Sequence, residues 1–241
     1  MKYRDIAYCA VMTALLIAAQ YVLSFVSGVE LVTVLLLTFS YVFGVRCGVL
    51  TAAAFSLLRC LIFGFFPNVL LLYLVYYTSF AALFGLCGRK GLPRFVCPLL
   101  LGITGTLSLA AAITGTGLPI SAVYITRVRV FLWILFGISM ALLVIYFYAS
   151  KSGPGRELAS LTALATFMTV LFTLLDDIIT PLTMGYSAEA AAGYFYGGFI
   201  AMLPQTVCAA VSVFALFLPL KKAFEVIKRQ KHGYSGDNYE N

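Results

Sequence analysis

Long apolar runs separated by short polar segments dominate this chain. Eight such runs cover residues 6–27, 30–45, 48–65, 68–87, 95–115, 129–149, 158–180 and 195–219. Because about 20 apolar helical residues span a bilayer, the pattern predicts an all-α polytopic membrane protein. One transmembrane domain is expected over 1–220, followed by a basic, then polar and disordered cytoplasmic tail over 221–241. The second run is short, which predicts a tilted, partly irregular or non-spanning helix.

The composition supports a membrane protein without a separate soluble domain. The chain has 241 residues, of which 62% are hydrophobic and 10% are charged, and its mean hydropathy is +1.01. A soluble domain carries about a quarter charged residues. The first apolar run is long enough to span and has no clear small-residue cleavage site after it. We therefore expect it to be a retained first helix.

The basic residues predict the orientation. If each apolar run crosses the membrane once, every second connecting segment lies on the same side. Thirteen of the sixteen basic residues lie in the segments placed on one side in this way: the N-terminus, Arg46, 89–94, 151–156 and the tail. Cytoplasmic segments carry such an excess, so both termini are expected in the cytoplasm and the protein in the plasma membrane. This pattern also accounts for the net charge of +7, and nucleic acid is not expected as a partner.

The residue types that support catalysis or metal binding are poorly represented. The six cysteines form no CxxC pair, the lone His232 lies in the tail, and the chain has no P-loop. We therefore expect no metal site, no cofactor and no ATP hydrolysis by this chain itself. An intramembrane enzyme is disfavoured because no nucleophile–base pair is recognisable.

Arg59 is the sharpest candidate for function. It lies inside the third apolar run, where a charge costs about 2.5 kcal/mol or more near the helix centre. One interpretation is a binding or counter-charge role in a cavity facing the outer side. The other is structural: the side chain snorkels to the interface, or pairs with Glu30 or Asp176 to hold helices together.

Further polar and aromatic candidates gather near the same predicted outer side. Asp176 and Asp177 precede Pro181 and Gly185, which are expected to break the helix there. These acids suit polar ligand groups, and a solvated helix end explains them equally well. The other candidates are tyrosines and amide side chains that could bind a flat, polar ligand. Alternatively, the tyrosines form an interfacial aromatic belt and the amides make contacts between helices. These candidates are Asn68, Tyr73, Tyr77, Tyr186 and Gln205.

The first run carries a stripe of small residues. Ala10, Ala14 and Ala18 are spaced four apart, so they share one helix face. Such a face permits close approach of another helix, either within the chain or in another subunit.

Three stretches together resemble the substrate-binding (S) components of energy-coupling factor (ECF) transporters, the vitamin-uptake branch of the ABC importers. The stripe AVMTALLIA at 10–18 is similar to the family's alanine motif. Residues 41–91 resemble its second to fourth helices, with a glycine-bounded inner turn and a Gly/Pro/Asn outer turn. Residues 172–224 resemble its last two helices. The family usually has six helices, so either the runs within 95–149 are an inserted hairpin or the count of eight runs is too high.

The resemblance implies a function and partners. It implies a vitamin or similar micronutrient bound in an outward cavity near Glu30, 65–77 and 183–196. It also implies a transmembrane coupling subunit that contacts Ala10, Ala14 and Ala18, and two ABC ATPase subunits that supply energy. The alternative is a stand-alone secondary transporter with Arg59, Asp176 and Asp177 as its coupling charges.

Overall fold

The computed structural model describes residues 3–26, 29–91, 93, 95–114, 122–148 and 153–236, and all regular structure in these ranges is helical. The helices are α1 (Tyr3–Leu23), α2 (Val32–Phe43), α3 (Val45–Phe63), α4 (Pro67–Lys90), α5 (Val96–Thr114), α6 (Ala122–Tyr148), α7 (Gly153–Met184) and α8 (Ala188–Gly236). By length and composition, six helical segments within the described ranges could cross a membrane. The predictions of an all-α fold and of several helices long and apolar enough to span a membrane are thus confirmed.

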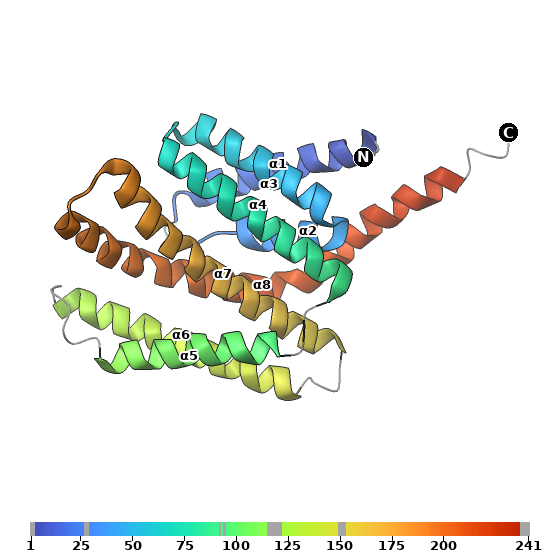
Figure 1. The fold of residues 1–241 in the computed structure, drawn as a ribbon. Coiled ribbons are helices and arrows are strands. Elements are labelled where there is room, and N and C mark those ends of the chain that lie inside the picture. Colours follow the sequence, from blue (N-terminus) through green and yellow to red (C-terminus); the bar gives the residue numbers. More distant parts are fainter. Residues whose placement is uncertain are drawn as a thin grey trace.

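The helices form three layers (Figure 1). The antiparallel pair α3 and α4 lies on one side together with α1, α7 and α8 pair in the middle, and α5 and α6 form a hairpin on the other side. The hairpin packs on α7 and α8 through two small apolar clusters. The largest apolar cluster instead joins α1, α2, α3, α4, α7 and α8.

Helix α2 is the core helix of this larger group. It packs against α3, α4 and α8, and ten of its twelve residues are buried. At 1.5 Å per residue it is about 18 Å long, well short of a bilayer core of about 30 Å. The prediction of a short second helix is confirmed. A helix that is apolar all round is expected to be buried on every side.

Glycine makes the tight junction between α2 and α3. Gly44 has φ +90°, a conformation that glycine adopts without strain, and it links the two helices with no further loop residue. On α4, Gly88 lies directly under the Tyr41 carbonyl group of α2. The missing side chain allows α2 and α4 to approach closely at this point.

Two expectations about helix ends are wrong. Helix α7 continues through Pro181 to Met184 and ends at Gly185, where the Tyr186 N–H donates to the Pro181 carbonyl at 3.0 Å. This is a glycine-dependent helix cap, placed one turn later than the proline. Helix α8 likewise passes through Pro204 and Pro219 to Gly236, so the expected disorder of the tail does not hold over 221–236. The last part of α8 projects beyond the bundle (Figure 1).

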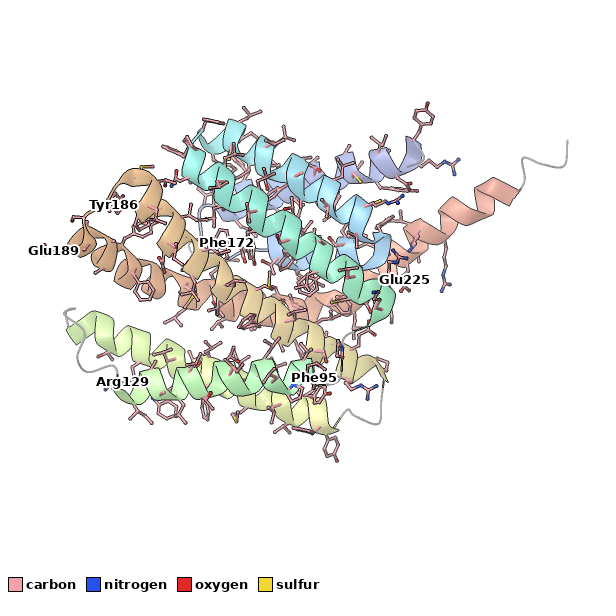
Figure 2. All side chains as sticks on the ribbon, in the orientation of Figure 1. Phe95, Arg129, Phe172, Tyr186, Glu189 and Glu225 are labelled. Carbon is pink, nitrogen blue, oxygen red and sulfur yellow. The ribbon has the colours of Figure 1, made fainter. Side chains whose placement is uncertain are left out.

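The two ends of the bundle differ in charge. The start of α1 and the end of α8 lie at the same end (Figure 1), and so do the α2–α3 junction and the end of α4. This basic end carries Arg4, Arg46, Arg89, Lys90, Arg156, Lys221, Lys222, Lys228 and Arg229. Glu225 marks the basic end and Glu189 the opposite end of α8 in Figure 2. Lys2, Arg94 and Lys151 lie outside the described residues.

Candidate functional site

A cavity of about 480 Å³ lies toward the end opposite the basic residues. Its walls come from the end of α1, the α1–α2 connection, the end of α3, the first half of α4, and α8. Four predicted site residues line it: Arg59, Tyr73, Tyr77 and Gln205. Residues nearly 150 positions apart therefore meet in one place, as the prediction of a shared site requires.

Arg59 of α3 lines this cavity and lies against two aromatic rings. The central guanidinium carbon lies 4.1 Å from the centroid of the Tyr73 ring and 5.6 Å from that of Phe63. Its Nε is buried and has no hydrogen-bond partner. Among the described residues, no carboxylate forms an ion pair with Arg59. The structural interpretation that Arg59 pairs with Glu30 or Asp176 is therefore wrong in this conformation.

Glu30 supplies a carboxylate to the same cavity and is held by two donors. Its Oε1 accepts from the Thr33 hydroxyl at 2.7 Å, and its Oε2 accepts from the Gln205 amide at 3.1 Å. The Glu30 backbone also contacts the Cys208 thiol, with N···Sγ of 3.5 Å and Sγ···O of 3.6 Å. These contacts fasten the α1–α2 connection to α8. The resemblance places the ligand cavity near Glu30, but Glu30 itself is not among the predicted site residues, although an acid directly before a short apolar helix is a usable signal.

Glu30 makes the stability of the empty protein depend on pH. Burial raises the pKa of Glu30, and the bonds from Thr33 and Gln205 offset part of that rise. A carboxyl whose pKa is raised by folding stabilises the fold when protonated, and this stability is lost as the pH rises through the folded-state pKa. At about pH 7.5, Glu30→Gln is expected to raise the thermal unfolding midpoint of the empty protein, because the substitution removes the cost of burying an ionised carboxyl.

The expected gain should shrink as the pH falls toward 4.5, the ordinary pKa of Glu, because the wild-type carboxyl is then protonated as well. Glu189→Gln is the matched control, since Glu189 is exposed at the start of α8. A gain that is absent at neutral pH, or that is equal in both variants, would contradict this account of Glu30.

An aromatic cluster lies behind the cavity. The Tyr73 and Tyr77 rings are 5.1 Å apart, Phe55 meets Tyr77 edge-on at 5.3 Å, and Phe172 of α7 lies 4.7 Å from Tyr76. Figure 2 shows Phe172 partway along the bundle. Such packed rings form a rigid wall, against which a flat ligand can stack with little loss of side-chain freedom.

Three other predicted residues belong to a separate polar network near the α7–α8 turn. The Asn68 amide donates to the Thr180 hydroxyl at 3.1 Å, and that hydroxyl donates to Asp176 Oδ1 at 2.6 Å. The Tyr194 hydroxyl donates to Asp176 Oδ2 at 2.9 Å, and Tyr186 stacks edge-on against Tyr194 at 5.9 Å. Both Asp176 oxygens thus have partners, and the network joins α4, α7 and α8 outside the cavity.

Asp177 differs from its neighbour. Its side chain is buried, and its Oδ1 has no hydrogen-bond partner. A Cβ at Gly198 would collide with this oxygen, so α8 approaches the carboxylate with backbone alone. Asp177 therefore lies inside α7 against α8, and the expectation that both acids end a broken helix is wrong.

The alanine stripe lies on the surface of the bundle. Ala10, Ala14 and Ala18 are all exposed, whereas Cys9, Met12 and Leu16 on the other face of α1 are buried. The small residues could pack against another helix of this chain or against another subunit. In the described part of the chain no helix covers this face, so packing within the chain is excluded there.

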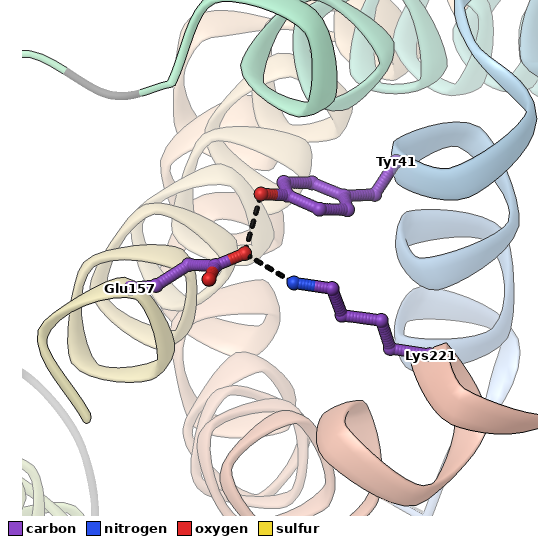
Figure 3. A network of polar contacts seen from close by, with 3 residues as sticks. All are labelled: Tyr41, Glu157 and Lys221. Atoms are coloured by element: carbon purple, nitrogen blue, oxygen red, sulfur yellow. Dashed lines mark hydrogen bonds and ion pairs between the residues drawn. The ribbon is translucent and has the colours of Figure 1, made fainter. Parts of the chain in front are cut away.

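A second polar network closes the basic end of the bundle (Figure 3). Glu157 of α7 accepts from the Tyr41 hydroxyl of α2 and pairs with Lys221 of α8 at 2.8 Å. Lys228 donates to the Val42 carbonyl at 2.5 Å. A cation at this position stabilises the C-terminal end of α2, where the helix dipole is negative. A cavity of about 310 Å³ lies beside Tyr41 and Glu157. These contacts join α2, α7 and α8 and anchor the part of α8 beyond Pro219 to the bundle.

Loss of the Lys221 contact is expected to weaken this end of the bundle. Lys221→Met should lower the free energy of unfolding by roughly 1 kcal/mol, because Glu157 loses its cation while both side chains remain partly exposed to water. Lys222→Met removes the same charge from an exposed neighbour and should change stability little. Thermal unfolding in a detergent micelle measures both. Equal effects of the two variants would show that the ion pair between Glu157 and Lys221 contributes nothing to stability.

The geometry thus divides the predicted site into a cavity and a separate network at the α7–α8 turn. Gln20, Glu30 and Thr33 complete the cavity region beyond the predicted residues. No protein-family model, no curated protein and no solved structure matches this chain.

Proposed function

We propose that this chain is the membrane-embedded substrate-capture subunit of an ECF-type importer for a vitamin or similar micronutrient. One observation carries the proposal: Arg59 lines a cavity of about 480 Å³ against the ring of Tyr73, and no residue in the described part of the chain forms an ion pair with it. An ionisable residue inside an apolar helix marks a binding or transport site when it faces a cavity. Cavities of this size hold small molecules. Arg59 suits an anionic or carbonyl group, and the tyrosines suit a flat ring.

The charge difference between the two ends of the bundle supports the proposed orientation. With the basic end in the cytoplasm of the cell, both termini lie inside. The cavity near the ends of α1 and α3 then lies toward the outer side of the plasma membrane, where an importer must capture its substrate.

The exposed alanine face supports the proposed partners. Ala10, Ala14 and Ala18 offer a flat helix surface on which another helix can pack closely. We assign this surface to a transmembrane coupling subunit, and two ABC ATPase subunits bound to it would supply the energy. In this assembly the chain binds substrate and carries out no catalysis.

The packing is consistent with a six-helix core plus a hairpin. Helices α1, α2, α3, α4, α7 and α8 share the largest apolar cluster. The α5–α6 hairpin lies on the outside of this group and has two smaller clusters of its own. We propose that α5 and α6 are an addition to the core of the family that the sequence resembles.

The energy source tests the proposal. After the co-purifying small molecule is identified, its uptake into cells is expected to stop when the nucleotide-binding site of the partner ATPase is inactivated. Uptake should persist when ion gradients are dissipated. Uptake that continues without any active ATPase would contradict the proposal.

A stand-alone secondary transporter is the second candidate. The buried, unpartnered Oδ1 of Asp177 favours it, since a carboxylate without a partner can take a proton or cation. In this alternative Arg59, Asp176 and Asp177 are the coupling charges. The same uptake measurement separates the two: dissipating the ion gradients would stop uptake by a secondary transporter.

A further inference from the structure

We infer that the cavity accepts a flat, bipolar molecule that carries an anionic or strongly accepting group at one end and a cationic or donating group at the other. The inference rests on the proposed capture function and names its substrate class. It starts from Arg59 and Glu30, two groups of opposite charge that come from different elements and line the same cavity.

Neither group satisfies the other. Among the described residues no ion pair joins Glu30 to Arg59. A guanidinium has five N–H donors, and the buried Nε of Arg59 is unused. A carboxylate has about four acceptor sites, and the described residues supply two hydrogen bonds to the Glu30 side chain, from Thr33 and Gln205.

Neighbouring side chains hold the two charges in place. The Gln205 amide and the Thr33 hydroxyl fix the Glu30 carboxylate, and the ring of Tyr73 supports the Arg59 guanidinium at 4.1 Å. If the two charges served only to join helices, a direct pair would repay their desolvation best. Fixed but unpaired charges instead form a site that is organised before the ligand arrives, which reduces the cost of binding.

The arrangement also explains how the cavity would reject close analogues. A molecule with only an acidic group would pair with Arg59 and place a second negative charge beside the buried Glu30 carboxylate, whose neutral donors Thr33 and Gln205 do not balance its charge. A molecule with only an amine would leave Arg59 unsatisfied. A site with buried polar groups discriminates strongly against a ligand that lacks the matching group. The rings of Tyr73 and Tyr77, with centroids 5.1 Å apart, line the same cavity and offer aromatic surface to a flat molecule.

Three small aromatic probes test the inference with the full chain in detergent, after removal of any retained molecule. They are 4-(aminomethyl)benzoate, which carries both charges, benzoate, and benzylamine. We expect 4-(aminomethyl)benzoate to bind at least about tenfold more tightly than either single-charge probe by calorimetry, the ratio that one extra charged contact supplies. Glu30→Gln should remove its advantage over benzoate, and Arg59→Gln its advantage over benzylamine. Glu189→Gln and Arg46→Ala alter exposed charges elsewhere and should leave all three affinities unchanged.

The outcomes separate this inference from the proposed function. Benzoate that binds as tightly as 4-(aminomethyl)benzoate, in a manner dependent on Arg59, would overturn the bipolar ligand and leave the capture site standing. An advantage of the bipolar probe that survives Glu30→Gln would also overturn the inference. Failure of all three probes to bind overturns it as well. In that case the capture function is judged separately, by whether the purified protein retains a small molecule.

Discussion

Replacement of Arg59 by alanine is expected to abolish retention of substrate while the protein stays folded. Binding should weaken about 10- to 100-fold, because a hydrogen bond to a charged group contributes about 1.5–3 kcal/mol. Stability should not fall, because the substitution removes a partly buried charge that has no ion-pair partner among the described residues. The measurement is the amount of small molecule released on denaturing the purified variant, relative to wild type.

Arg46→Ala is the matched control for this prediction. Arg46 lies on the same helix, α3, but is exposed at the basic end. The Arg46→Ala variant should retain substrate as the wild type does. Unchanged retention in the Arg59→Ala variant would return Arg59 to a structural role and remove the main support for a binding site at the cavity.

A methyl group at Gly88 is expected to destabilise the whole bundle. In Gly88→Ala, the new Cβ would collide with the Tyr41 carbonyl, which is backbone and cannot rotate away. Helix α2 must then move off α4, and overpacking of this kind costs about 1–3 kcal/mol. The shift also disturbs Tyr41, whose hydroxyl bonds Glu157. Thermal unfolding of the purified protein should show a clear drop in the midpoint.

Gly102→Ala is the control with the same chemical change. Gly102 lies within α5, and a Cβ there meets no atom within 4 Å. Alanine favours a helix over glycine by up to about 1 kcal/mol, so this variant should be as stable as the wild type or slightly more so. If both alanines had the same effect, the close contact between α2 and α4 would not matter for stability.

The helices of this fold were largely predictable from the apolar pattern. Each of the eight apolar runs corresponds to a helix, and the short second run is the short helix α2. The ends were less predictable, because Pro181 and Pro219 were expected to end helices. At Pro181 the cap at Gly185 follows one turn later, and beyond Pro219 the contacts of Lys221 and Lys228 support the continuing helix. A local glycine cap thus ends α7, and tertiary contacts support α8 beyond Pro219.

The candidate site was predictable only in part. Arg59 was identified because a charge in an apolar run is costly. Tyr73 and Tyr77 were identified because they lie near the same predicted outer side. Which residues share the cavity depends on how α1, α3, α4 and α8 pack, and a single sequence does not specify this. Asp176 and Tyr186 were therefore grouped with the cavity although they belong to the network around Tyr194. Glu30 was expected near the cavity but was not named as a site residue.

The most direct test of the proposed capture function is native mass spectrometry of the complex extracted gently from source membranes. The account predicts that this chain is found with a transmembrane coupling subunit and two ABC ATPase subunits, and that the assembly or the free chain carries one small molecule. It also predicts that the small molecule is missing from the Arg59→Ala variant. A chain that is found without ATPase subunits, and that releases no small molecule on activation, would contradict the account.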